Sequence, residues 1–222
     1  MNSTLRVISI FKSIQGEGLM IGIPSSFIRL AGCNLYCRYC DTKEAWNVEN
    51  VVEIGVNDVV KKVKEYGVPW VTITGGEPLL QLEAVEELVI KLKTSGFRVC
   101  IETNGTVKPS SNLLELVDMW SVSPKLKSFG PKIANINIFK DLLGDAISKN
   151  IANKIYFKFV VTEPKTDFEE IKNLIPDGFP AEKVIVQPNW YVTKYECLVD
   201  YVLNNNIPYR VLPQLHKLVN LP

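Results

Sequence analysis

The sequence predicts an α/β fold: an open, partial (β/α) barrel whose strands are mostly parallel. Apolar strand-like runs alternate with helical patterns, which is typical of parallel strands joined by right-handed crossovers. There are too few such units for a closed barrel of eight. The length of 222 residues and the hydrophobic content of 46% suit one domain with a real core. No internal repeat, low-complexity tract or linker divides the chain.

The expected elements follow from these apolar patterns. Strands are expected at 4–10, 26–30, 70–74, 97–102, 118–122, 155–161, 183–187 and 208–212. Helices are expected at 57–66, 81–95, 136–149, 166–175 and 193–205. The first strand is expected to form a hairpin with its neighbour, so that residues 1–25 make a small appendage to a single domain covering 1–222.

Polar motifs directly follow five of the expected strands. Cys33 follows SSFIRLAG, Gly75 follows WVTIT, Asn104 follows RVCIET, Ser123 follows DMWSV and Gln187 follows KVIV. Ligands of parallel α/β folds sit at the carboxyl ends of the strands. We therefore expect these motifs to converge on one mouth.

Three cysteines in the run GCNLYCRYCDT, Cys33, Cys37 and Cys40, have the spacing C-x3-C-x2-C. Three soft ligands with no fourth ligand nearby describe an iron–sulfur cluster that keeps one iron free for chemistry. A structural zinc site needs four ligands, so it would require the fold to bring Cys100 or Cys197 close. A disulfide framework is disfavoured because five cysteines in this length are few and odd in number.

Composition limits the classes of partner. The net charge is +1 and there is no basic block, so the sequence favours a small free substrate over direct nucleic-acid binding. The start of the chain lacks the apolar region of a secretory signal, and no apolar run is long enough to span a bilayer. Free cysteines and an oxygen-sensitive cluster motif predict a cytoplasmic protein.

The cysteine motif resembles that of the radical S-adenosylmethionine (SAM) superfamily, and the whole chain resembles its 7-carboxy-7-deazaguanine synthase (QueE) family. The matching stretches are SIQGEG (13–18), GxPxxFIRL (22–30), GCNLYCRYCDT (32–42), TGGEP (74–78), ETNG (102–105), SPK (123–125), QP (187–188) and QLHK (214–217) near a C-terminal proline. The cysteine motif alone indicates only the superfamily. The opening run, the CDT and the C-terminal pattern make the family resemblance specific.

The resemblance implies a [4Fe–4S] cluster on the three cysteines, with SAM on the open iron. It also implies SAM contacts from Tyr39, Cys40, Asp41, Gly75, Gly76, Glu102, Asn104, Ser123, Pro124, Lys125, Gln187, Pro188, Asn189 and Trp190. Paired glycines let the backbone approach a ligand closely. Glu77 is expected to order this loop rather than touch substrate.

Three residues keep open alternatives. If Glu102 points into the barrel, its buried charge needs a partner, either the SAM ribose or a neighbouring lysine or arginine. Lys158 lies mid-strand between two phenylalanines and its role is open. By resemblance the Thr42 hydroxyl ligates Mg²⁺, which keeps several waters and accepts few protein ligands. The alternative for Thr42 is an ordinary turn or helix cap.

The resemblance also implies a substrate set and a reaction. The substrate residues would be Ile14, Gln15, Gly16, Glu17, Arg29, Thr74, His216 and Pro222. Gln15 offers a donor and an acceptor to a pterin amide edge, Glu17 could accept from a guanidine-like pair, and Arg29 could clamp a carboxylate. The reaction would contract the ring of 6-carboxy-5,6,7,8-tetrahydropterin to 7-carboxy-7-deazaguanine with loss of ammonia, supplying queuosine or archaeosine.

The expected partners are the pterin, a reductant such as flavodoxin or ferredoxin, and a second copy in a homodimer. Two other classes are weighed against this one. A glycyl-radical activase would need an exposed docking face and would leave the CDT and C-terminal patterns unexplained. A non-enzymatic iron–sulfur electron carrier would have no use for GGEP or a substrate cluster.

Overall fold

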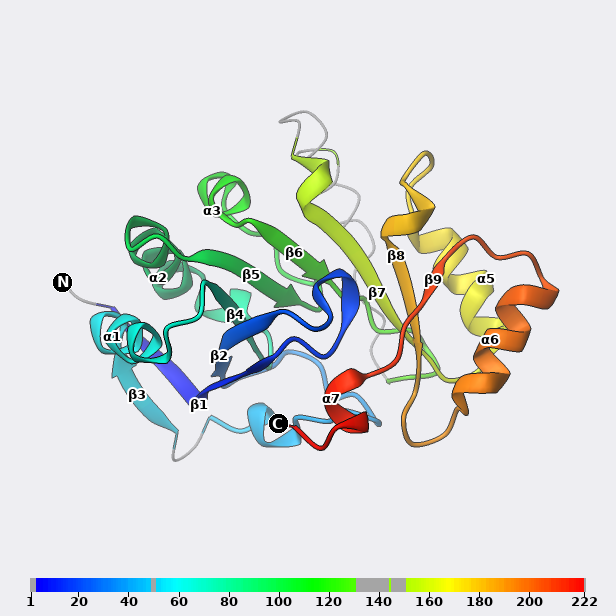
Figure 1. The fold of residues 1–222 in the computed structure, drawn as a ribbon, viewed down its shortest axis with the longest axis horizontal. Helices are drawn as coiled ribbons and strands as arrows, with labels where there is room; N and C mark the ends of the chain where they lie inside the picture. Colours follow the sequence, from blue (N-terminus) through cyan, green and yellow to red (C-terminus); the bar gives the residue numbers. More distant parts are fainter. Residues whose placement is uncertain (1–2, 49–50, 131–143, 145–150, 222) are drawn as a thin grey trace.

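Nine strands form one open sheet in the computed structural model, which describes residues 3–48, 51–130, 144 and 151–221 (Figure 1). The strand order is β3-β1-β2-β4-β5-β6-β7-β8-β9. The strands are β1 (Thr4–Ile14), β2 (Pro24–Leu30), β3 (Val52–Gly55), β4 (Trp70–Gly75), β5 (Arg98–Thr103), β6 (Met119–Val122), β7 (Ile155–Val161), β8 (Val184–Pro188) and β9 (Arg210–Val211). β1 pairs antiparallel with β2 and β3, and every pair from β2 to β9 is parallel. The predicted fold class is confirmed, and the barrel is not closed.

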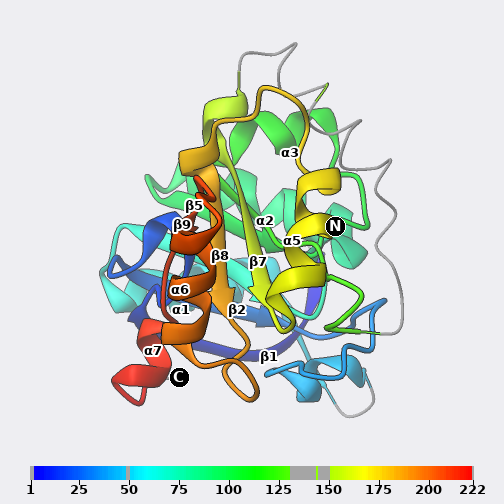
Figure 2. The same ribbon diagram turned by 90° about the vertical axis from the view of Figure 1, so that its right-hand side faces the viewer.

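Helices connect the parallel strands and flank the sheet (Figures 1 and 2). They are α1 (Val56–Tyr66), α2 (Leu82–Thr94), α3 (Ser111–Leu116), α5 (Pro164–Leu174), α6 (Tyr195–Asn204) and α7 (Leu215–Leu218). Among the described residues, no helix has the length and apolar character needed to cross a membrane. The helix expected at 136–149 falls on residues outside the described ranges, Gly144 apart.

Most of the expected elements are confirmed with small shifts at their ends. β7 has the predicted bounds, whereas β1 continues beyond residue 10 to Ile14 and β9 shrinks to two residues. The apolar patterns did not predict β3, α3 or α7. β3 and α7 have four residues each and α3 has six, so none of them is long enough to show a clear apolar period.

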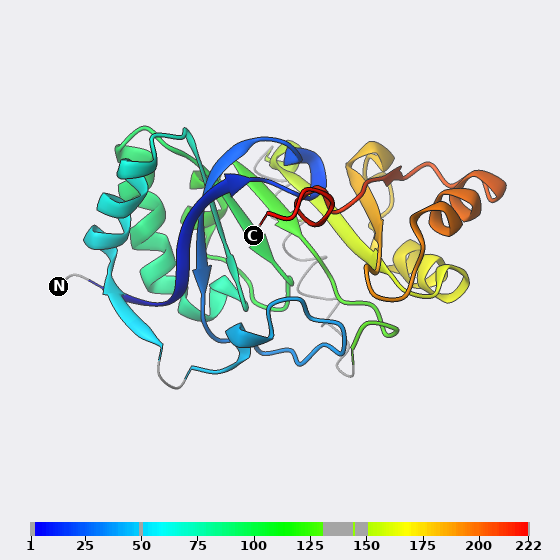
Figure 3. The same cartoon turned by 60° about the horizontal axis from the view of Figure 1, so that its bottom comes forward.

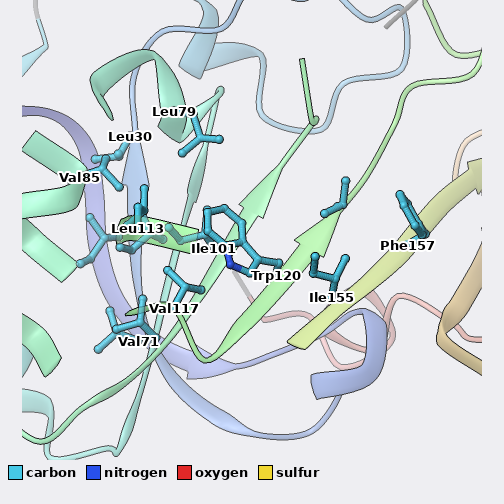
Figure 4. Packing of buried hydrophobic residues seen from close by; sticks show 14 of the residues in the cluster. Leu30, Val71, Leu79, Val85, Ile101, Leu113, Val117, Trp120, Ile155 and Phe157 are labelled. Atoms are coloured by element: carbon cyan, nitrogen blue, oxygen red, sulfur yellow. The ribbon is translucent and has the colours of Figure 1, made fainter. Parts of the chain in front are cut away.

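Side-chain alternation divides the sheet into two chemically different faces. On each parallel strand, every second residue is apolar and packs toward the helices, as Val71, Ile101, Trp120 and Phe157 do (Figure 4). Trp120, for example, is only 1% exposed. These residues join apolar side chains of α1, α2, α3, α5 and α6 in one core cluster. Burial of this face is the main stabilising term for the fold.

The intervening residues of the same strands form a largely polar inner face. Arg29 of β2, Thr74 of β4, Glu102 of β5, Lys158 of β7 and Gln187 of β8 all occupy alternate positions to the core residues and line one cavity. The alternation of side chains along each strand is therefore enough to place core residues on one face of the sheet and site residues on the other.

The connection between β1 and β2 lies across this inner face. Figures 1 and 3 show it beside α7, near the middle of the molecule. A backbone hydrogen bond joins them, since the N–H of Leu215 donates to the carbonyl oxygen of Gly16 at 2.8 Å. The N-terminal hairpin and the C-terminal helix thus cover the cavity together.

Candidate active site

The cavity lies at the carboxyl ends of the parallel strands, where the sequence analysis expected the motifs to converge. The expected site residues that line it are Ile14, Gln15, Gly16, Glu17, Arg29, Cys33, Cys37, Tyr39, Cys40, Asp41, Thr42, Thr74, Gly75, Gly76, Glu102, Asn104, Ser123, Lys125, Gln187, Asn189, Trp190 and His216. Pro124 and Pro188 are buried but do not line the cavity, and Pro222 is outside the described residues. The structure therefore brings nearly all the expected residues to one place.

The three motif cysteines are free thiols on the loop after β2, and all three line the cavity. Leu35 and Phe129 pack beside them in a small apolar cluster. The Cys33 thiol acts electrostatically on both Cys37 and Cys40, so the three groups lie near one another.

The two remaining cysteines do not complete a four-ligand site. Cys100 is buried in β5 and Cys197 is exposed on α6, and neither lines the cavity. Three thiols that line one cavity, with no fourth cysteine beside them, fit a cluster that keeps one iron open. The lack of a fourth cysteine ligand disfavours the zinc alternative.

Burial controls the ionisation of the motif cysteines. It raises the pKa of Cys37 to about 11 and raises the pKa of Cys33 and Cys40 as well, while the nearby Lys125 ammonium opposes the shift. Thiolates are the ligand form, and bound metal charge favours them. These thiols therefore remain protonated in the bare protein and ionise on metal binding.

The TGGEP loop lies against the cysteine loop through close backbone contacts. A Cβ on Gly75 would lie 2.2 Å from the Leu30 carbonyl oxygen, and Gly75 also has a φ of +126°. A Cβ on Gly76 would lie 2.0 Å from the Gly32 carbonyl oxygen. The paired glycines therefore permit the two loops to meet, in addition to the close ligand approach that the sequence suggested.

Glu77 orders this loop, as expected. Its carboxylate accepts hydrogen bonds from the backbone N–H of Leu79 at 3.1 Å, the Thr103 hydroxyl at 2.9 Å and the backbone N–H of Asn104 at 2.7 Å. The side chain is completely buried, and burial raises its pKa to about 7 despite these donors. One carboxyl group thus joins the loops after β4 and β5.

The expected SAM-contacting residues line the cavity beside the cysteines. The Asn104 amide nitrogen lies 4.0 Å from the Cys33 sulfur and 3.1 Å from the Asn34 side-chain oxygen. The Lys125 ammonium donates to the Ser123 hydroxyl at 2.9 Å. Trp190 is 47% exposed at the outer rim, within cation–π distance of Lys217.

Glu102 has two neutral hydrogen-bond donors in addition to a neighbouring lysine, which was one of the two partners expected from sequence. The Gln15 amide donates to it at 3.0 Å and the Thr74 hydroxyl at 2.7 Å. The Lys158 ammonium also interacts with it electrostatically. The chain itself therefore satisfies this carboxylate with two neutral donors and a neighbouring charge.

Glu17 is the centre of a buried polar cluster that the sequence analysis did not anticipate. Its carboxylate accepts from the Lys158 ammonium, from the Gln187 amide at 3.1 Å and from the Gln214 amide. Burial alone would raise the pKa of Glu17, but the charge and hydrogen bonds of Lys158 and the bond from Gln214 lower it to about 2. The sequence pointed to Glu17, Gln187 and the QLHK stretch that begins at Gln214 as site residues and left the role of Lys158 open, but it did not show that these groups bond to one another.

The substrate-side residues keep polar groups toward the cavity. The Arg29 guanidinium stacks over Phe11 at 5.2 Å and lies 3.8 Å from the Glu44 carboxylate, which is about half exposed. This one contact at 3.8 Å leaves most of the five N–H donors of Arg29 free for an anionic group.

Gly16 packs against His216 so closely that a Cβ on Gly16 would lie 2.2 Å from the Nδ1 atom of His216.

Thr42 lies at the rim of the cavity, where its hydroxyl donates to the Asp41 carboxylate at 3.2 Å. It precedes a 3-10 helix at Lys43–Trp46 but makes no side-chain capping bond. Asp41, Glu17 and His216 bring ligand atoms within 4.8 Å of one another. Because Lys158 already pairs with Glu17, this trio is not by itself a cation site.

Comparisons with known proteins agree with the family resemblance seen in the sequence motifs. The model of the radical SAM superfamily matches residues 27–175. A 7-carboxy-7-deazaguanine synthase from Methanospirillum hungatei is 37% identical over all of this chain and 88% of its own length. The chain belongs to the 7-carboxy-7-deazaguanine synthase family. A second member, from Pyrobaculum aerophilum, is 38% identical over 83% of this chain and 79% of its own length.

The fold of this synthase family is also seen in a solved structure. QueE from Escherichia coli superimposes with a TM-score of 0.72, covering 96% of this chain and 95% of its own, at 24% identity. Membership of the radical SAM superfamily implies a [4Fe–4S] cluster and SAM as cofactors. The three cavity cysteines fit that cluster, and the activase and electron-carrier alternatives are not favoured.

The buried Glu77 carboxyl predicts a pH-dependent stability in cluster-free protein. Its folded pKa of about 7 exceeds the ordinary value of 4.5, so folding favours its protonated form. This contribution is complete below about pH 4.5 and is lost as the pH rises through about 7, a total effect of about 3 kcal/mol.

The measurement is the free energy of unfolding between pH 5 and pH 8, for the parent and for Glu77→Gln. We expect the parent to lose more stability than the variant over this range. Equal losses would mean that the three hydrogen-bond donors keep Glu77 ionised in the folded protein.

Proposed function

We propose that the protein is a 7-carboxy-7-deazaguanine synthase, a radical SAM lyase. It converts 6-carboxy-5,6,7,8-tetrahydropterin to 7-carboxy-7-deazaguanine with loss of ammonia. The observation that carries this proposal is the single cavity lined both by Cys33, Cys37 and Cys40 and by Gln15, Arg29 and His216. Relatives with this name match the chain along its whole length.

Each group in the cavity has a task in this reaction. When bound, the cluster and SAM supply a 5′-deoxyadenosyl radical. Cys33, Cys37 and Cys40 would hold the cluster, and the loops carrying Gly76, Asn104 and the other expected SAM contacts would hold SAM beside it. The remaining residues orient the pterin and exclude water, so that a reactive carbon lies close to the radical.

The pterin would lie under the β1–β2 connection. Arg29 would bind the substrate carboxylate through its guanidinium, and the Gln15 amide would face the pterin amide edge. His216 reaches the same space from α7. Glu17, Thr74 and the C-terminal Pro222 complete the proposed substrate set, together with Ile14 and Gly16.

Further proposals concern the metal and the cellular context. We infer that the Thr42 hydroxyl binds Mg²⁺ shared with the substrate, with Asp41 adding negative charge nearby. The protein would form one domain with its N-terminal hairpin, act as a homodimer in the cytoplasm, and take electrons from a flavodoxin or ferredoxin. The product would supply deazapurine nucleosides such as queuosine or archaeosine.

An anaerobic assay tests the activity. Reconstituted protein with SAM, reductant, Mg²⁺ and the carboxypterin should release 7-carboxy-7-deazaguanine and ammonia in equal amounts, measured by chromatography and mass spectrometry. SAM should not be consumed in proportion to product, because it is regenerated. Cleavage of SAM to 5′-deoxyadenosine with no deazaguanine formed would refute the substrate assignment.

Thr42→Ala tests the Mg²⁺ proposal. The variant should need a higher Mg²⁺ concentration for half-maximal rate, by about tenfold, because it lacks the one protein ligand. Its iron and sulfide content should equal the parent's. Thr42→Ser is the matched control and should keep the parental Mg²⁺ response; an alanine variant with parental rate and Mg²⁺ response would show that Thr42 is not a ligand.

A further inference from the structure

Lys158 is a buried lysine that lines the cavity, and the proposed reaction gives it no role. It lies mid-way along β7, and its side chain is 9% exposed. Its neighbours Phe157 and Phe159 point to the core on the other face of the sheet. Strand alternation therefore directs the ammonium inward, where it pairs with Glu17.

This ion pair connects parts of the chain that are far apart in sequence. Glu17 lies on the β1–β2 connection, Lys158 on β7, Gln187 on β8 and Gln214 just before α7, and the last three all donate to the Glu17 carboxylate. The sheet order places β1 and β2 several strands from β7 and β8. One carboxylate thus joins the two ends of an open barrel across its inner face.

Close packing extends this connection to the rest of the cover. A Cβ on Gly18 would lie 2.4 Å from the Tyr156 hydroxyl, so the connection lies directly on β7. The Leu215 N–H donates to Gly16, and Gly16 touches the His216 ring. Residues 15–18 and α7 therefore form a single cover over the cavity. This cover rests on the Glu17–Lys158 ion pair.

The charges make this arrangement depend on the lysine. Three carboxylates favour the charged form of Lys158: Glu17, Glu102 and, more weakly, Asp41. Glu102 in turn accepts from Gln15 and Thr74. Removing the ammonium would leave a buried carboxylate at Glu17 with only amide donors, a costly state that the cover would relieve by moving outward.

We propose that Lys158 is a positioning residue which, through Glu17, holds the 15–18 segment and α7 over the cavity and so sets the affinity for the pterin substrate. The proposal rests on the proposed function for the identity of the substrate. The mechanical part, that the lysine holds the cover in place, stands on the contacts alone. The two parts can be tested separately.

Hydrogen–deuterium exchange tests the mechanical part without substrate. In Lys158→Met, amides of residues 15–18 and 214–218 should exchange at least about tenfold faster than in the parent, because the cover opens more often. The matched control is Lys93→Met, which breaks another ion pair, with Asp118 at 2.6 Å, on the outer side of the sheet. The control should leave exchange in these two segments unchanged; unchanged exchange in Lys158→Met would overturn the proposal.

Kinetics with a double variant separate positioning from simple stabilisation. Lys158→Met should lower Tm by about 10 °C, whereas Glu17→Gln/Lys158→Met no longer has the unpaired Glu17 carboxylate and should recover most of that loss. The KM for the carboxypterin should rise about tenfold in Lys158→Met with a smaller change in kcat, because this variant lacks the charge pair that seats the cover but keeps Glu17, a member of the proposed substrate set. SAM affinity and iron content should remain parental.

Two results would contradict the positioning role. If the double variant recovers KM together with Tm, Lys158 only stabilises the fold. If Lys158→Met keeps the parental KM, the lysine does not position the cover for the pterin. Absence of product with the parent protein would refute the proposed function instead, and the exchange experiment would still decide the role of Lys158.

Discussion

The period of two along each strand is the constraint from which the rest of the structure follows. It sends one set of side chains into an apolar core against the helices and the other set into a shared polar cavity. Parallel pairing from β2 to β9 then brings all the strand ends to one rim. The cysteine loop after β2 and the glycine loop after β4 meet there because Gly75 and Gly76 allow their backbones to touch.

Burying carboxylates in the cavity costs free energy because they lose contact with water. Hydrogen bonds and one ion pair within the site offset this cost. Glu77, Glu102 and Glu17 each receive at least two hydrogen bonds from neighbouring groups, and only Glu17 has a direct ammonium partner in Lys158. Apart from the local bond from Leu79 to Glu77, these bonds run between different loops and strands. The polar groups that shape the cavity therefore also hold its walls together, which links substrate recognition to the stability of an incomplete barrel.

The local patterns predicted the fold well. Seven-residue β7 and the helices α1 and α5 appear within two residues of their expected bounds, because their apolar periods are long and clear. β3, α3 and the Glu17 cluster were missed for different reasons. The first two are short, and the cluster depends on contacts between residues up to 197 positions apart, such as Glu17 and Gln214. Sequence spacing identified the cysteines as a set, but only the tertiary structure shows which donors each buried carboxylate finds.

The central claim is that the three cysteines leave one iron of a cluster without a protein ligand. Electron paramagnetic resonance of the anaerobically reconstituted, reduced protein, recorded with and without SAM, tests it most directly. The account predicts a [4Fe–4S] signal whose g-values shift when SAM is added, because SAM binds the open iron. A spectrum that SAM leaves unchanged, or a purified protein that holds tetrahedral zinc in place of a cluster, would contradict it.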